Sequence, residues 1–172
     1  MSVVGARTPS PTVVLLAELD GAQIDALLAS YGVRLERVPA GVEIPGSYWR
    51  ESEAGLIGNT VYVRADTPAH SFLHELCHFI CMDRARRAAL ATDAGGTDEE
   101  ECGVCYLQVL LAERLDGFGA QRCLDDMDVW GYTFREGLAR AWFDGDGVHA
   151  RAWLIEHGLL DSVERPTLRL RA

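Results

Sequence analysis

The chain has 172 residues, a formal net charge of −10 at pH 7, and 48% hydrophobic residues. This length suffices for one domain with a sizeable core, and the composition is that of an ordinary globular protein. The acidic balance excludes a typical nucleic-acid binder, which needs clustered basic side chains to contact phosphates. All 16 basic residues are arginines, which excludes lysine Schiff-base chemistry and a Walker A phosphate loop.

The sequence also favours a protein of the cytoplasm. The N-terminus has no basic segment followed by an apolar one, so we expect no signal peptide. No apolar run is long enough to cross a bilayer, and we expect no membrane partner. Five cysteines, an odd number, suit a reducing compartment.

The first part of the chain reads as a leader, a helix and a small sheet. Residues 1–12 carry two prolines and are expected to form a loose leader. Asp20 is a candidate cap for a helix running to Tyr31, and Gly32 is expected to end it. Strands are expected at residues 33–38, 47–50 and 59–64, and these predict a small antiparallel sheet.

The remainder is predicted to be mainly helical. Asp66 and Pro68 favour a helix start, and this helix is expected to run from about residue 68 to about residue 86. Further helices are predicted over residues 98–115, 133–143 and 148–157. We therefore expect a single α+β domain over residues 1–172, with a core at residues 20–115 and a helical C-terminal extension at residues 116–172.

Residues 74–78 carry the strongest functional signal, because they read His-Glu-Leu-Cys-His. Composition alone predicts roughly 0.01 chance matches to H-E-x-x-H in such a chain. Two histidines four residues apart share one face of a helix, where both His74 and His78 can reach one zinc ion. Glu75 between them can act as the base that takes a proton from the attacking water. The apolar residues Leu73, Leu76 and Ile80 fall on the opposite face.

A catalytic zinc needs a third protein ligand and one open position for water. The helix predicted over residues 98–115 begins with three consecutive acids. Glu100 shares a stripe with apolar residues at positions 104, 107 and 111, so it is the favoured third ligand. Glu101, which shares its side with Gln108, and then Glu99 are the alternatives.

Two other interpretations remain open. Cys102 and Cys105 form a C-x-x-C that, with His74 and His78, would make a closed His2Cys2 zinc site in a non-enzymatic interaction module. Alternatively, the chain is a degenerate peptidase fold that binds a partner protein through aromatic side chains of its C-terminal helices. The candidates are Trp130, Tyr132, Trp142, Phe143 and Trp153.

The stretch from Gly46 to Leu111 resembles the ImmA/IrrE-type zinc metallopeptidases of the minigluzincin group. The features that carry this resemblance are the strand Asn59-Thr60-Val61-Tyr62-Val63, the Ser71-Phe72-Leu73 that leads into H-E-x-x-H, and a later acidic helix start. The resemblance implies a zincin-like fold, a hydrolase of the gluzincin type, Zn²⁺ as cofactor, and His74, His78 and Glu100 as ligands with Glu75 as base. It also implies a peptide or protein substrate and a regulatory role. The Cys102-Gly103 that follows the acids differs from the pattern of the family.

A peptidase also needs groups that hold the substrate. The strand predicted over residues 59–64 would offer its edge to an extended peptide. A tyrosine or histidine should stabilise the oxyanion, and His70, Tyr62 and Tyr132 are the candidates.

Overall fold

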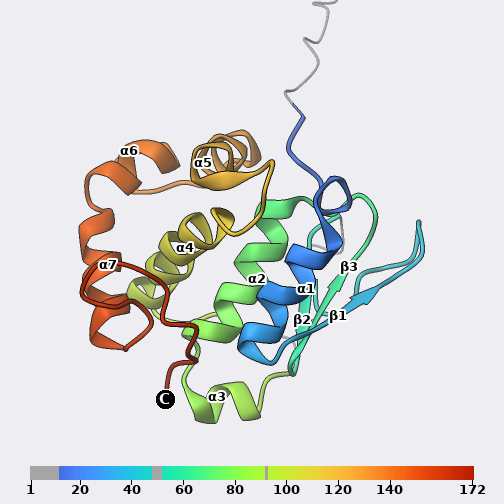
Figure 1. The fold of residues 1–172 in the computed structure, drawn as a ribbon, viewed down its shortest axis with the longest axis horizontal. Coiled ribbons are helices and arrows are strands. Elements are labelled where there is room, and N and C mark those ends of the chain that lie inside the picture. Colours follow the sequence, from blue (N-terminus) through green and yellow to red (C-terminus); the bar gives the residue numbers. More distant parts are fainter. Residues whose placement is uncertain (1–11, 48–51, 92) are drawn as a thin grey trace, which may run out of the picture.

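The structure is a computed structural model that describes residues 12–47, 52–91 and 93–172. Most of the predicted leader and most of the strand predicted at residues 47–50 lie outside the described residues. Within them, the chain forms a short 3-10 helix, a three-stranded sheet and seven α-helices (Figure 1). In chain order the elements are η1 (Leu16–Glu18), α1 (Gly21–Tyr31), β1 (Arg34–Arg37), β2 (Gly55–Ile57), β3 (Thr60–Val63), α2 (Ala69–Cys81), α3 (Arg84–Ala88), α4 (Asp98–Ala112), α5 (Gly119–Trp130), α6 (Ala139–Asp144) and α7 (Gly147–Glu156).

The protein is α+β, as predicted, but its sheet is mixed rather than antiparallel. The strand order is β1-β3-β2. β2 and β3 form an antiparallel hairpin, whose turn contains Gly58 in the left-handed region at φ 57°. β1 instead pairs in parallel with β3, from Arg34 opposite Thr60 to Arg37 opposite Val63. After the long connection from β1 the chain enters β2 in the opposite direction, and the β2–β3 hairpin then turns it parallel to β1. Strand patterns alone do not fix this path.

Local signals in the sequence set the ends of the first helices. The Asp20 side chain accepts a hydrogen bond from the backbone N–H of Ala22 at the start of α1, and Gly32 ends that helix at φ 67°, as predicted. The motif helix is shorter than predicted, because Met82 after Cys81 has an extended backbone. Asp83 then caps the separate short helix α3.

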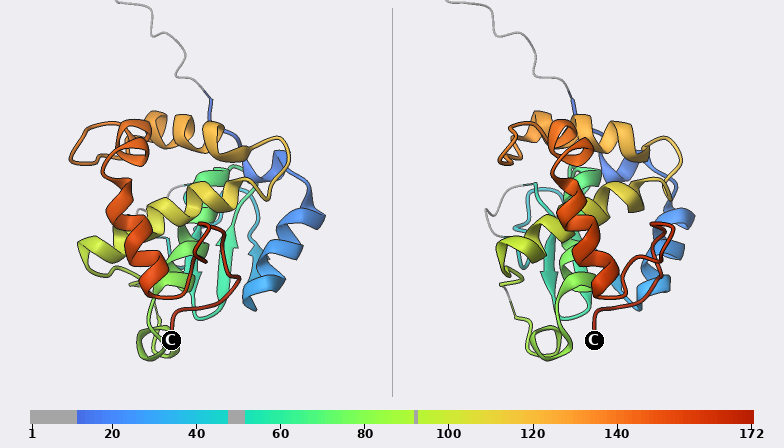
Figure 2. Two further views of the ribbon diagram at one scale, coloured as in Figure 1. Left: turned by 60° about the vertical axis from the view of Figure 1, so that its left-hand side comes forward. Right: turned by 90° about the vertical axis from the view of Figure 1, so that its left-hand side faces the viewer.

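The elements stack in the order sheet, α2, α4 and α7 (Figure 1). One face of α2 packs against β2 and β3, and its other side contacts α4. α5 and α6 cross one end of this stack, while α7 packs against α4 on the side away from α2 (Figure 2). One continuous apolar core links these layers. The motif helix is therefore held between the sheet and the later helices.

The C-terminal part packs closely onto the rest of the chain. α6 begins at Ala139 rather than near residue 133, because Phe134 and Gly137 close a tight turn through reciprocal backbone hydrogen bonds. α7 approaches α4 so closely that a Cβ on Gly103 would lie 2.7 Å from the Trp153 ring. After α7 the chain returns to the end of α2, where the backbone N–H of Arg171 donates to the Ile80 carbonyl.

Among the described residues, no helix combines the length and the apolar character that crossing a membrane would require.

Candidate metal centre

Helix α2 presents His74 and His78 together on one face, as the spacing predicted. Their ring centroids are 4.6 Å apart, and their Nε2 atoms are separated by 3.1 Å. The opposite face is core, because Leu73, Leu76 and Ile80 are at most 1% exposed. The amphipathic pattern of this helix thus fixes which way the two imidazoles point.

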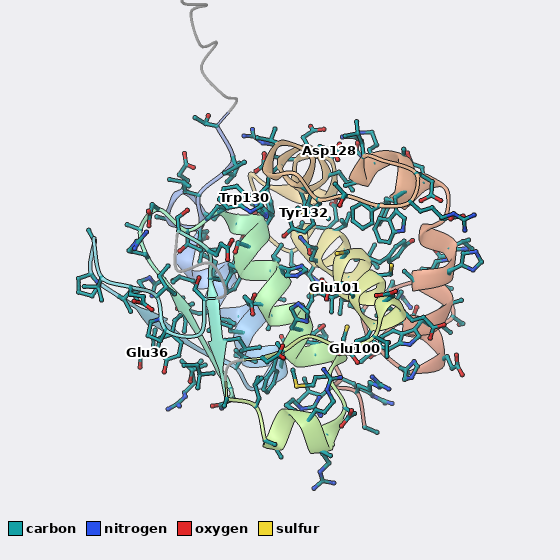
Figure 3. All side chains as sticks on the ribbon, turned by 180° about the vertical axis from the view of Figure 1, so that it is seen from behind. Glu36, Glu100, Glu101, Asp128, Trp130 and Tyr132 are labelled. Atoms are coloured by element: carbon teal, nitrogen blue, oxygen red, sulfur yellow. The ribbon has the colours of Figure 1, made fainter. Side chains whose placement is uncertain are left out.

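Glu101 on α4 brings a carboxylate to the two histidines. Its Oε1 lies 3.2 Å from His74 Nε2, and its Oε2 lies 3.5 Å from His78 Nε2. The carboxylate is 44% exposed. Three potential ligand atoms therefore converge at the surface between α2 and α4, and Figure 3 shows Glu101 pointing from α4 toward α2.

The three separations fit a tetrahedral zinc site. Ligand atoms about 2.0 to 2.1 Å from a tetrahedral ion are about 3.3 Å from one another. The Nε2–Nε2 distance of 3.1 Å, the 3.2 Å from His74 Nε2 to Glu101 Oε1 and the 3.5 Å from His78 Nε2 to Glu101 Oε2 are close to that value, with one carboxylate oxygen near each histidine. Two imidazoles and a carboxylate are also a common donor set for catalytic zinc. The residues present therefore fit a zinc ion, with a fourth position left for water.

The favoured third ligand, Glu100, lies elsewhere. Its carboxylate accepts hydrogen bonds from Arg86 Nη1 at 2.8 and 2.9 Å and from Arg171 Nη1 at 2.9 Å. The Glu100 side chain is 4% exposed, so a buried carboxylate is paired here with two partly exposed arginines. Glu100 thus faces α3 and the C-terminal segment, and the expected ligand set of His74, His78 and Glu100 does not assemble.

The reason lies in the packing of α4. The helical wheel correctly predicted that Glu100 would be buried, but burial alone does not say which neighbour a side chain meets. Almost every α4 residue from Gly103 to Ala112 is buried, so this helix has no single inward face. The stripe that meets the histidines consists of Glu101, Cys105 and Gln108.

Gln108 orients His74 through the ring nitrogen that does not face Glu101. Its Oε1 lies 2.7 Å from His74 Nδ1, and its Nε2 donates to the His70 carbonyl at 3.4 Å. Because the amide nitrogen faces a carbonyl, its oxygen faces the imidazole and accepts a hydrogen bond from the Nδ1–H group. In the neutral imidazole, Nε2 then carries the lone pair that a metal requires. In the metal-free protein, burial lowers the pKa of His74, but Tyr132, Cys105 and Glu101 outweigh burial and raise that pKa well above 6.5, so a bound metal would displace a proton. Gln108 was not among the predicted site residues, although a glutamine in an otherwise apolar helix segment was an available signal.

His78 is also suited to metal binding. Burial, and then the neighbouring His74, lower its pKa to about 4, so the imidazole is neutral at pH 7. The Nδ1 atom of His78 is buried without a hydrogen-bond partner among the described residues. His78 therefore has an orienting partner only on its Nε2 side, unlike His74.

Glu75 lies in the same cleft. The cleft has a volume of about 490 Å³, and its lining includes His74, Glu75, His78 and Glu101. Burial, with smaller contributions from Glu101 and Glu53, raises the pKa of Glu75 to about 7. This value suits a general base that works near neutral pH.

Of the oxyanion candidates, Tyr132 is the one that lines this cleft (Figure 3). Its ring centroid lies 5.6 Å from that of His74, and burial raises the pKa of its phenol, which stays protonated. His70 is fully buried, and its Nδ1 lies 3.3 Å from the Tyr132 hydroxyl. His70 therefore contacts the Tyr132 hydroxyl from the core side. Tyr62 lies on β3 and is not among the described residues that line the cleft.

Cys105 borders the site, but Cys102 does not join it. His74, Glu101 and Cys105 offer ligand atoms within 4.8 Å of one another. Cys102 falls outside this group and lines a second pocket. Within the described residues, one cysteine of the predicted His2Cys2 site, Cys105, therefore lies close to His74.

Two other expectations about binding surfaces also change. The prediction that β3 offers a free edge is wrong, because β3 is the central strand. The outer side of β2 is approached by the chain near Pro45, whose carbonyl would lie 1.9 Å from a Cβ on Gly55. Most of the candidate interaction aromatics also pack internally: Phe143 stacks on Tyr106, and Trp142 is 4% exposed.

Comparisons with protein-family models, with curated proteins and with solved structures found no match to this chain. The functional interpretation therefore depends on the motif and on the geometry of the cleft.

Proposed function

We propose that this protein is a zinc-dependent metallopeptidase of the H-E-x-x-H type, related to the ImmA/IrrE group, in which Glu101 replaces Glu100 as the expected third ligand. The observation that carries the proposal is the convergence of His74 Nε2, His78 Nε2 and the Glu101 carboxylate at 3.1 to 3.5 Å, with Glu75 in the same cleft. A zincin-like arrangement of α2 and α4 belongs to this proposal.

Each residue then has a chemical role. His74, His78 and Glu101 would hold zinc, which when bound supplies a Lewis acid that polarises a carbonyl and lowers the pKa of water. Glu75 would accept the proton of the attacking water. The protonated Tyr132 hydroxyl would donate a hydrogen bond to the oxyanion that develops on the substrate carbonyl. Gln108 and His70 would orient His74 and Tyr132.

The test is a metal analysis paired with a hydrolysis assay on a fluorogenic peptide library. Wild type should bind one zinc per chain and cleave peptides. Glu75→Gln should keep the zinc and lose about 10²- to 10⁴-fold in rate, since only the base is removed. Glu75→Gln with unchanged activity would contradict the role of Glu75, and a wild type without stoichiometric zinc would contradict the site.

A second candidate function follows from Cys105, which lies beside His74 and Glu101. If its thiolate bound the metal, the site would be closed, and the protein would be a zinc-stabilised interaction module without hydrolytic activity. Cobalt substitution separates the two functions, because thiolate ligation gives an intense near-ultraviolet charge-transfer band. The peptidase proposal expects no such band in wild type and an unchanged spectrum in Cys105→Ser.

A further inference from the structure

A second pocket adjoins the candidate metal cleft. It has a volume of about 630 Å³ and lies between α4, the turn after α5, and the start of α7. Glu101 and Tyr132 line both cavities, so the two are neighbours across these side chains. A peptide bound with its scissile carbonyl in the metal cleft can therefore place an adjacent side chain in this second pocket.

The floor of the second pocket is aromatic. Phe134 and Trp142 stack with ring centroids 4.2 Å apart and an interplanar angle of 11°. Trp142 is almost completely buried, and Phe134 is half-buried, so the pair forms a fixed surface. A flat aromatic surface accepts the apolar stem of a long side chain, and its face attracts a cation.

The rim of the second pocket is acidic. Asp98 from the first turn of α4, Glu136 from the turn before α6, and Asp146 before α7 join Glu101 in the lining. Glu136 and Asp146 lie close enough for their carboxyl groups to share a hydrogen bond, which raises the pKa of Glu136. Arg135 is the one arginine among the lining residues that the structure describes. The metal cleft itself is lined by four acids and, among the described residues, no arginine.

We propose that the second pocket binds an arginine or lysine side chain next to the cleaved bond, so that the substrates are basic peptides or basic protein segments. This inference rests on the proposed peptidase function and specifies its substrate class. The aliphatic stem would lie on the Phe134–Trp142 surface, and the cationic group would meet the carboxylates of Asp98 and Glu136 at the rim. The 630 Å³ volume leaves ample room for either side chain.

Binding and cleavage of matched peptides test this proposal. Fluorescent peptides of one sequence would carry arginine, lysine, norleucine or glutamate at each position flanking the cleaved bond. Anisotropy would measure their binding to the Glu75→Gln protein, with and without zinc, and kcat/KM would be measured in wild type. We expect the basic peptides to bind about five- to tenfold more tightly than the norleucine peptide, since each partly exposed ion pair contributes modestly. This preference should shrink as ionic strength rises.

Two double variants locate the preference. Asp98→Asn with Glu136→Gln should bring the ratio of the affinities for the basic and norleucine peptides close to one. The matched control, Asp25→Asn with Glu36→Gln, removes the same charge from exposed positions on α1 and β1, and Figure 3 shows Glu36 on the sheet side of the molecule. The control should retain the full preference.

The outcomes separate the two proposals. Zinc binding and cleavage without a preference for basic residues would overturn the pocket assignment and leave the peptidase intact. Equal loss of preference in both double variants would also overturn it, because net charge would then explain the effect. A chain that binds no zinc and cleaves nothing, yet binds basic peptides through Asp98 and Glu136, would overturn the peptidase and support the pocket.

Discussion

The two sides of the first turn of α4 carry consecutive glutamates in opposite surroundings. On the cleft side, Glu101 is 44% exposed and meets two imidazoles. On the arginine side, Glu100 is 4% exposed and is held by Arg86 and Arg171 (Figure 3). The Glu101 carboxylate faces two imidazole Nε2 atoms that could also bind a metal ion, whereas the Glu100 carboxylate is held by two arginines.

The difference shows that the partners of a carboxylate, rather than its burial, indicate its role. Two arginines donate three hydrogen bonds to the Glu100 carboxylate, so its charge is already compensated without a metal. The Glu101 carboxylate contacts the Nε2 atoms of two imidazoles, which are the atoms that a metal ion would share with it. Removing the carboxylate is therefore expected to have different effects at Glu101 and at Glu100.

Removing the carboxylate on the cleft side should have the largest effect. Glu101→Ala is expected to weaken zinc binding by more than about a hundredfold. Losing a residue that only hydrogen-bonds to a ligand usually weakens binding by about 10- to 100-fold, and losing a ligand itself should cost more. Peptide hydrolysis should be lost with the metal. Competition with a chromophoric chelator measures the affinity, and Glu100→Gln is the matched control, which should retain its zinc. If Glu101→Ala retains its zinc, Glu101 is not a ligand and the two glutamates do not differ in the proposed way.

Removing the carboxylate on the arginine side should destabilise the fold instead. Glu100→Ala leaves Arg86 and Arg171 without their shared anion. Because both arginines are partly exposed, we expect a cost of about 1 to 2 kcal/mol in the free energy of unfolding, below that of breaking a fully buried cluster. Urea denaturation of the metal-free protein measures this cost. A variant as stable as wild type would show that the triad contributes no net stability.

Glu75 predicts a pH dependence of stability in the metal-free protein. Its pKa is raised to about 7 in the folded chain from an ordinary value of 4.5. Between these two pH values the folded state holds a proton that the unfolded state has lost, so stability falls as pH rises. Glu75→Gln should therefore stabilise the metal-free protein at pH 7.5 by on the order of 2 kcal/mol, with no gain at pH 4. Thermal melts across this range measure the difference, and an equal gain at both pH values would contradict it.

The smallest expected effect on zinc binding comes from changing Gln108, the hydrogen-bond partner of His74. Gln108→Leu removes the acceptor from His74 Nδ1 and should weaken zinc binding about tenfold, as loss of an orienting partner usually does. Gln108→Glu keeps an acceptor at the same place and should retain most of the affinity. If the leucine and glutamate variants bind zinc equally, Gln108 does not orient the ligand.

The sequence was sufficient for the parts of the site that depend on local spacing. His74, Glu75 and His78 follow from one helix and its amphipathic pattern, and the Asp20 and Gly32 caps follow from residue type. The position of Glu101 depends on how α4 is rotated against α2, and a helix buried on nearly all sides gives no such signal.

Contacts between distant segments were the other features that the sequence did not reveal. Arg171 reaches Glu100 from 71 residues along the chain, and no local pattern marks that pairing. The parallel pairing of β1 with β3 likewise depends on the path of the connection between β1 and β2. Tyr132 was one of three candidates until the turn after α5 placed it over His74.

Gly103 gives a practical way to find relatives of this chain. Any side chain at this position would collide with Trp153, so a glycine there marks proteins in which α7 closes over α4. A search pattern that joins H-E-x-x-H to a later Glu-x-Gly, with a tryptophan some fifty residues beyond, is therefore more selective than the zinc motif alone. Sequences that keep the motif but carry a larger residue at this glycine should have a different covering element, and their pockets should differ accordingly.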